Sequence, residues 1–289
     1  CNNCYHIATE HFNTCCTVNP RVYRENRVPL TLPRAQTARS VVVVGGGPAG
    51  LKAALTAAQR GHQVTLVEQS GALGGLMIPA SVGAFKEDLR RYLSYLRRQV
   101  EKSQIHVMLH TRADRALLEH LHPDAVILAV GGRAVMPPVP GLGTSGAVQA
   151  VALLNAGLET AGTRVTILGG GSIGCELALE LAALDRMVTV VELRDKLAAN
   201  GNELYRQDLM LHLEQETRIT ILTQTVCTGV TAQGCTVREK DGGTRVIPHD
   251  TFVIAAGLRA DADAVEALYG VVPETYYVGD CKRAASITE

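Results

Sequence analysis

The sequence predicts an α/β protein with two doubly wound domains, and three observations support that prediction. A short run of valines leads into a glycine-rich turn, which an alanine- and leucine-rich stretch follows. A second apolar run then ends in a glutamate. The whole arrangement occurs again further along the chain. Apolar strands that alternate with helices are typical of parallel sheets whose faces are covered by helices.

The first copy begins at residues 41–44, four consecutive valines that predict a buried parallel strand. Residues 48–59 predict a helix, which Gly61 ends, and residues 63–67 predict the next strand. Strand, turn, helix and strand in this order form the βαβ unit on which dinucleotide-binding domains are built.

The turn of this unit carries the pattern G-x-G-x-x-G, which predicts a Rossmann-like dinucleotide site. The first glycine permits the tight turn, the second lets the backbone approach a pyrophosphate, and the third lets the helix pack close to the strand. Free N–H groups at the start of the helix attract phosphate, and the acid accepts hydrogen bonds from ribose hydroxyls. The predicted contacts are Gly45, Gly47, Pro48, Ala49, Gly50 and Glu68.

The second copy covers residues 164–195, and its glycines and its acid each lie 124 residues after their counterparts. The two copies therefore align without a gap. They imply either two bound nucleotides or a duplicated fold with one inactive copy, and the intact glycines and acid of both copies favour two nucleotides. The predicted contacts in this copy are Gly169, Gly171, Ser172, Ile173, Gly174 and Glu192.

The segments between these motifs complete the predicted organisation. Residues 21–39 predict a basic linker with two prolines. Residues 85–102 predict an amphipathic helix, and we expect its arginines to form a solvated face. Residues 202–216 predict another helix, followed by strands, the last of them at 250–256. We expect three parts: a cysteine-rich segment and linker at 1–39, a discontinuous first domain at 40–143 plus 250–289, and an inserted second domain at 144–249.

Length and charge limit the classes of function. A chain of 289 residues is long enough for two compact domains. Its formal net charge of zero gives no reason to expect nucleic acid or an anionic membrane as a partner. We find no apolar run of membrane-spanning length and no signal peptide. The chain begins with a cysteine, which we interpret as the sign of a processed product or a fragment, and a homo-oligomer stays open.

Four of the eight cysteines lie within the first 16 residues. Cys1 and Cys4 form C-x2-C, and eleven residues separate Cys4 from Cys16. Thiolates spaced in this way bind an iron–sulfur cluster or structural zinc. Because His6 and His11 could complete a zinc site, both metals stay open beside a pair of unligated thiols. The remaining cysteines are scattered, which predicts a reducing, cytoplasmic compartment.

The complete set of motifs resembles the two-dinucleotide flavoprotein reductases over residues 40–280. In that family an FAD unit contains an inserted NAD(P)H unit, each unit has an ATG-like strand end, and a G-D pair follows. Here those strand ends read A-V-G at 129–131 and A-A-G at 255–257. The resemblance implies FAD at the first site, NADH at the second with NADPH as the alternative, and further contacts from Gly74, Gly75, Leu76, Gly131, Gly257, Gly279 and Asp280.

The N-terminal cysteines narrow the resemblance to the old-yellow-enzyme-like iron–sulfur flavoenzymes, the 2,4-dienoyl-CoA reductase and trimethylamine dehydrogenase group. In that group a barrel carrying FMN precedes four cysteines that bind one 4Fe–4S cluster. If Cys1 is the first ligand, the third falls near Ala8, which cannot ligate. If Cys1 is the second ligand, Cys4 and Cys16 fit as the third and fourth. In that case the first ligand is expected upstream of residue 1. The resemblance then implies that this chain is the C-terminal half of a longer enzyme.

The resemblance implies an NADH-oxidising half of such an enzyme. Electrons would pass from NADH to FAD, whose ribityl chain Asp280 would contact, and through the cluster to the FMN barrel, where an enoyl C=C bond is reduced. No catalytic residue is expected here, because that acid–base step belongs to the barrel. An amine dehydrogenase with ADP in the first site and a nucleotide-binding redox scaffold stay open. Dithiol chemistry is not expected, because no cysteine follows Gly74-Gly75 and Cys175 stands alone.

Overall fold

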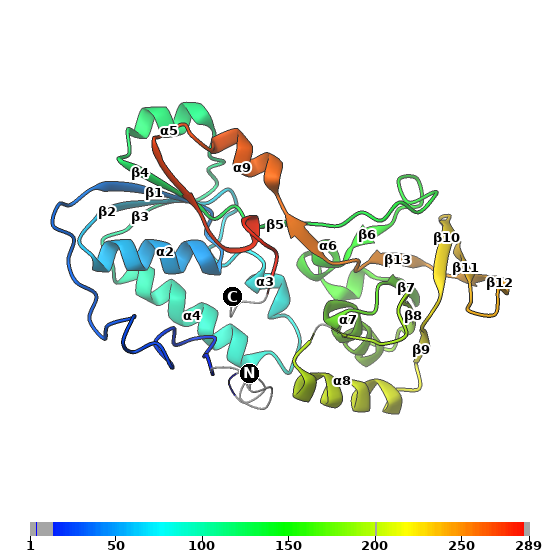
Figure 1. Cartoon of the computed structure of the whole chain (residues 1–289). Coiled ribbons are helices and arrows are strands. Elements are labelled where there is room, and N and C mark those ends of the chain that lie inside the picture. The colour runs from blue at the N-terminus through cyan, green and yellow to red at the C-terminus, as the bar shows by residue number, and fades with distance from the viewer. Residues whose placement is uncertain (1–3, 5–13, 200, 286–289) are drawn as a thin grey trace. The chain divides into compact units, whose positions relative to one another are not determined.

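The computed structural model describes residues 4, 14–199 and 201–285. The chain divides into two compact units (Figure 1). Within the described residues, the first unit comprises Cys4 together with residues 14–133 and 258–285, and the second comprises residues 134–257. The predicted α/β class is confirmed, because each unit is built around a five-stranded parallel sheet.

The sheet of the first unit has the strand order β15-β4-β1-β2-β3, and its neighbouring strands are parallel. The valine run forms its central strand, since a strand buried on both faces needs apolar side chains on both. The strands are β1 (Ser40–Val44), β2 (Gln63–Val67), β3 (His106–Met108), β4 (Ala125–Leu128) and β15 (Glu274–Tyr277).

Helices cover both faces of this sheet (Figure 1), and alternate valines of β1 belong to the cores on the two faces. Val41 and Val43 pack with residues of α2 (Pro48–Gln59) and α4 (Glu87–Glu101). Val42 and Val44 pack with residues of α5 (Arg115–Leu121) and α9 (Ala262–Leu268) on the opposite face. Each buried valine contributes about 1.5–3 kcal/mol through the apolar area that it removes from water. The C-terminal end of β1, which leads into the first glycine turn, is therefore held in a packed core.

The second unit repeats this sheet with the order β6-β13-β7-β8-β9, again with parallel neighbours. Its central strand is the apolar run that opens the second copy of the motif. The strands are β6 (Val148–Gln149), β7 (Arg164–Leu168), β8 (Met187–Val191), β9 (Ile219–Leu222) and β13 (Thr251–Ile254).

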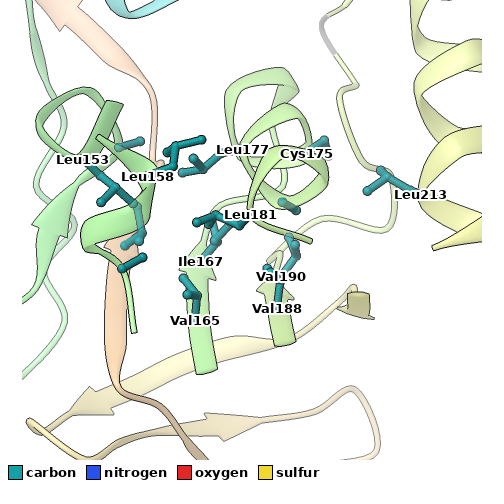
Figure 2. Packing of buried hydrophobic residues seen from close by; sticks show 14 of the residues in the cluster. Leu153, Leu158, Val165, Ile167, Cys175, Leu177, Leu181, Val188, Val190 and Leu213 are labelled. Atoms are coloured by element: carbon teal, nitrogen blue, oxygen red, sulfur yellow. The ribbon is translucent and has the colours of Figure 1, made fainter. Parts of the chain in front are cut away.

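The two faces of the second sheet are covered differently. On one face, Val165, Ile167, Val188 and Val190 point toward Leu177 and Leu181 of α7 (Figure 2). The helices of this core are α6 (Ala150–Ala156), α7 (Ser172–Ala183) and α8 (Glu203–Gln215). On the other face, Phe252 and Ile254 pack against a three-stranded antiparallel sheet formed by β10 (Val226–Val230), β11 (Gly234–Arg238) and β12 (Thr244–Pro248).

The second unit extends beyond residues 144–249 on both sides. β13, which the sequence analysis placed in the first domain, pairs with β7 in the second sheet, where Val253 lies opposite Ile167. Without β13, β7 would have a hydrogen-bonded neighbour on one edge only. The segments that connect the units, β5 (Gly132–Ala134) and β14 (Leu258–Ala260), pair with each other.

Several short helical elements were not predicted. They are α3 (Met77–Ala80), α5, α6, α9 and the 3-10 turns η1 (Leu158–Thr160) and η2 (Gly279–Cys281). Residues 21–39 contain no helix or strand, as the prolines of the linker predicted. Within the described part of the chain, no helix has the length and apolar character needed to cross a membrane.

We expect the stability of the second unit to fall in acid because of His249. Its ring is 3% exposed, Nε2 lies 3.2 Å from the Thr231 carbonyl oxygen, and Nδ1 has no hydrogen-bond partner. Burial lowers the pKa of His249, and nearby Arg164 lowers it further against the opposing effects of Thr231 and Asp250. The folded state therefore disfavours the charged ring. Its contribution to stability is complete above an unfolded pKa of about 6.5 and is lost as the pH falls below that value.

Urea unfolding at a series of pH values measures this effect. His249→Phe keeps a buried ring but cannot titrate, so we expect its unfolding free energy to depend less on pH between neutral and mildly acidic conditions. The exposed His120→Gln serves as the control and should follow the unsubstituted protein. Equal pH dependence in all three proteins would show that His249 is not the responsible group.

Candidate dinucleotide sites

The first glycine turn adopts a backbone that only glycine tolerates well. Gly45 has φ +106°, and a Cβ at this position would overlap the carbonyl oxygen of Ala129. A Cβ at Gly50 would overlap the carbonyl oxygen of Gly45. These two glycines therefore close the turn between β1 and α2, as the motif predicted.

Gly47 has a different role, because its surroundings are open. A Cβ there would meet only the Cα of Gly75, at 4.0 Å. Gly47 is the N-cap residue of α2, and no side chain caps the helix. The first amides of α2 are thus available to a ligand, and the open glycine in front of them leaves space for a pyrophosphate. The residues present fit a dinucleotide.

The second turn reproduces this geometry. Gly169 has φ +113° beside the carbonyl oxygen of Ala255, and a Cβ at Gly174 would overlap the carbonyl oxygen of Gly169. Gly171 is the N-cap residue of α7, where again no side chain caps the helix, and no atom lies within 4 Å of its hypothetical Cβ. Ser172 and Ile173 form the first turn of α7. The second site therefore fits a dinucleotide for the same reasons as the first.

Both predicted acids bond to the glycine turns themselves. The Gly46 amide donates to Oε2 of Glu68 at 2.6 Å, and the Ser70 amide donates to Oε1 at 2.7 Å. In the second unit, the amides of Gly170 and Arg194 donate to Glu192 at 2.6 and 2.8 Å. Sequence reasoning missed this role. The predicted contact of each acid with a ribose stays a prediction.

The segment after each acid folds back onto its glycine turn. The Gly74 amide donates to the Gly46 carbonyl at 2.7 Å, and the Ala198 amide donates to the Gly170 carbonyl at 2.8 Å. Ala198 lies 124 residues after Gly74, so the correspondence extends beyond the acids. Gly75 has φ +51° and contacts Gly47, and Leu76 precedes α3 as its N-cap. We call residues 73–76 and 197–199 the two lip segments.

The two ATG-like strand ends lie beside the glycine turns. The Ala129 amide donates to the Val44 carbonyl at 2.7 Å, and the Ala255 amide donates to the Leu168 carbonyl at 2.8 Å. The glycines that follow, Gly131 and Gly257, have φ +78° and +95°, and a Cβ added to either would have no atom within 4 Å. Each strand end thus places a glycine with open space around it beside the glycine turn of its own unit.

The G-D pair near the C-terminus lies close to the first helix. Gly279 has φ +72°, and a Cβ on it would be 2.6 Å from the Cβ of Ala49 in α2. Asp280 follows in η2, where its Oδ1 accepts a hydrogen bond from the Ala285 amide at 3.3 Å. The fold therefore brings Gly279 from the far end of the sequence to the start of α2, which sequence spacing alone could not show.

The cysteines near the second turn are not placed for dithiol chemistry. Cys175 is fully buried in α7, and its thiol donates to the Gly170 carbonyl at 3.3 Å. Burial, followed by the charge of Glu192, raises the pKa of the Cys175 thiol to about 12. Cys227 and Cys235 interact with each other within the core that covers the opposite face of the second sheet. In the described residues, neither glycine turn has a cysteine pair beside it.

Part of the proposed metal site lies outside the described residues. Cys1 belongs to that part, whereas Cys4 is exposed and Cys16 is partly buried. Burial raises the pKa of Tyr92 on α4, with smaller contributions from Tyr95 and Cys16. Among residues 4, 14–199 and 201–285, no group of three His, Cys, Asp or Glu side chains is arranged to hold a metal ion.

The arginines of α4 do not form a uniformly solvated face. Arg91 and Arg98 are exposed, but Arg97 is partly buried and donates from Nε to the Leu73 carbonyl at 2.7 Å. Arg90 donates to the carbonyls of Ser81 and Gly83, both at 2.7 Å. The amphipathic pattern predicted the helix correctly, but it could not reveal these contacts because their partners are backbone carbonyls outside the helix.

The sequence matches the pyridine nucleotide-disulphide oxidoreductase family over residues 39–278, and the chain belongs to that family. It is 34% identical over 258 residues to bilirubin reductase of Mediterraneibacter gnavus (strain CC55_001C), covering 89% of this chain and 40% of that protein. It is 35% identical over 247 residues to NADH oxidase of Thermoanaerobacter brockii, covering 84% of this chain and 37% of that protein.

The solved structure of a 2-naphthoyl-CoA reductase–2-naphthoyl-CoA complex is similar to the whole chain. Its TM-score is 0.92 at 27% identity, and the match covers 100% of this chain and 44% of that one. The chain thus spans about two fifths of the length of the curated relatives it matches. These similarities confirm the predicted resemblance to the reductase half of the flavoenzyme group. They also support FAD and NADH as its nucleotides.

Proposed function

We propose that this chain is the NADH-oxidising, FAD-containing electron-transfer half of a larger oxidoreductase that reduces a conjugated C=C bond. The observation that carries the proposal is the presence of two complete dinucleotide sites with the same glycine turn, acid and lip segment. A relative is an NADH oxidase, and two similar proteins are reductases of bilirubin and 2-naphthoyl-CoA, both conjugated compounds.

The proposal assigns FAD to the first unit and NADH to the second. Bound FAD supplies hydride acceptance and passage of electrons to one-electron carriers. In this proposal the pyrophosphates bind at Gly47 and Gly171, and the acids that follow β2 and β8 bind ribose hydroxyls. Asp280 contacts the first nucleotide. We assign no acid or base to these units, because binding and orientation are what the residues beside the glycine turns can provide.

The proposal also includes a 4Fe–4S cluster on Cys1, Cys4 and Cys16, with the fourth ligand upstream of the chain, and an FMN barrel that carries the reduced substrate. The spacing of those cysteines supports this part. A reducing, cytoplasmic compartment would suit the free buried thiols of the second unit.

Nucleotide analysis and dye reduction test the assignment. The purified chain is saturated with FAD, freed of excess, and denatured to release what it retained. We expect released FAD and NADH-dependent reduction of an artificial electron acceptor. Retention of ADP but not FAD would instead favour the amine dehydrogenase alternative, and retention of FAD with no dye reduction would favour a scaffold. Either result would contradict the proposal.

We expect NADH to be preferred over NADPH. Two backbone amides orient the Glu192 carboxylate, which would repel the 2′-phosphate of NADPH by about 1 kcal/mol or more. Arg194 could attract that phosphate, but its side chain is exposed and only its backbone amide bonds to Glu192. Dye reduction with each nucleotide gives the two kcat/KM values. An equal or higher value with NADPH, unchanged in Glu192→Ala, would show that Glu192 does not set the preference.

A further inference from the structure

We infer that Arg97 and Arg206 are positioning residues, each of which holds the lip segment of one nucleotide site; this inference rests on the proposed function. Arg97 lies on α4 and donates from Nε to the Leu73 carbonyl at 2.7 Å. Arg206 lies on α8 and donates from Nε to the Leu197 carbonyl at 2.9 Å. Leu197 lies 124 residues after Leu73, so both arginines bond to the same position of the repeat.

The lip segments connect these arginines to the glycine turns. The amide of the residue after each leucine donates a hydrogen bond to a carbonyl oxygen of the glycine turn. Gly74 donates to Gly46, and Ala198 donates to Gly170. Both leucine side chains also lie against those glycines, since a Cβ on Gly46 would be 2.7 Å from Leu73 Cδ2 and a Cβ on Gly170 would overlap Leu197 Cδ2. Movement of a lip segment would therefore change the shape of its glycine turn.

The two arginines do not correspond in the repeat. They are 109 residues apart, whereas the turns, acids and lip segments are 124 apart. The chain between lip segment and helix differs in length in the two units, yet each helix supplies a guanidinium to the same carbonyl. The same contact is therefore made in both units by arginines at positions that are not equivalent in the repeat. A guanidinium suits this purpose because its charge strengthens the hydrogen bond.

Both arginines are well placed to act through the lip segments. Arg206 is 21% exposed and lies 3.5 Å from Glu203, so it is partly fixed on its own helix. Its lip segment bonds to the turn that leads into α7, through the Ala198 amide and the Gly170 carbonyl, and Gly201, which follows it in the chain, would bring a Cβ to 3.2 Å from Oγ of Ser172. In the first unit, the corresponding segment brings Gly75 against Gly47. We infer that each arginine orders the amides and the acid that receive the nucleotide.

A crossed pair of substitutions tests this inference. We expect Arg97→Met to weaken FAD binding about tenfold and to leave the KM for NADH of the FAD-saturated protein unchanged. We expect Arg206→Met to raise that KM about tenfold, with kcat at saturating NADH unchanged and FAD affinity unaffected. Because ADP-ribose carries the pyrophosphate that the turn beside this lip segment is proposed to bind, its inhibition constant should rise by the same factor in Arg206→Met.

The controls separate positioning from general destabilisation. Arg98→Met and Gln207→Met change exposed neighbours on the same helices and should alter neither nucleotide. Arg97→Lys and Arg206→Lys keep a cationic donor and should restore part of the affinity. Equal loss of both nucleotides in either methionine variant, or affinities that match the controls, would overturn the inference. Failure of the unsubstituted chain to bind FAD or NADH would contradict the proposed function instead.

Discussion

Gly171→Ala is expected to leave the fold intact and to weaken NADH binding strongly. Gly171 has φ −67°, which alanine adopts readily, and no atom lies within 4 Å of the added Cβ. The methyl group would instead occupy the space through which the backbone approaches the pyrophosphate. An overpacked contact of this kind costs about 1–3 kcal/mol, which corresponds to a roughly 5- to 150-fold higher KM. Steady-state dye reduction by the FAD-loaded chain measures it.

Two further glycines make this experiment specific. Gly143→Ala also adds a Cβ with no neighbour within 4 Å, at an exposed position of the same unit, and should change neither KM nor melting temperature. Gly174→Ala places its Cβ on the Gly169 carbonyl oxygen and should lower the melting temperature. An unchanged KM in Gly171→Ala would show that the pyrophosphate does not bind at the start of α7.

Glu68→Ala is expected to abolish retention of FAD during purification. The carboxylate is 7% exposed and accepts hydrogen bonds from the amides of Gly46 and Ser70. Its removal leaves these two amides without an acceptor, and each amide that stays buried and unpaired costs about 1–3 kcal/mol of stability. It also removes the proposed ribose contact. We therefore expect a loss of FAD affinity larger than either effect would cause alone, measured by quenching of flavin fluorescence.

The matched variants distinguish the two contributions. Glu68→Gln keeps one carbonyl oxygen as an acceptor and should lose less affinity than Glu68→Ala. Glu192→Ala makes the equivalent change in the second unit and should leave FAD binding unchanged while it weakens NADH. Full FAD content in Glu68→Ala, at an unaltered melting temperature, would contradict the assignment of FAD to the first site.

The local parts of both sites could be predicted from the sequence. The strand–turn–helix units depend on residues close together in the chain, so their glycines at fixed spacing predicted the turns found at Gly45 and Gly169. The same spacing predicted the position of Glu68 but not its bonds to the Gly46 and Ser70 amides. A glutamate that binds a ribose and one that binds its own loop have the same sequence pattern.

The long-range parts could not be predicted in this way. β13 is a short apolar strand that could complete either sheet, and only its pairing with β7 decides between them. The contact of Gly279 with Ala49 joins positions at opposite ends of the first unit. The bonds of Arg97 and Arg206 end on backbone carbonyls, which every residue possesses. For such contacts the side-chain pattern carries no information about the partner.

Anaerobic titration of the FAD-loaded chain with NADH tests the central claim most directly, because that claim requires both nucleotides to act together. We expect the yellow absorbance of the bound flavin to bleach in proportion to added NADH, and Gly171→Ala to require far more NADH for the same bleaching. A bound flavin that stays oxidised in excess NADH, but bleaches with dithionite, would contradict the proposal that this chain oxidises NADH.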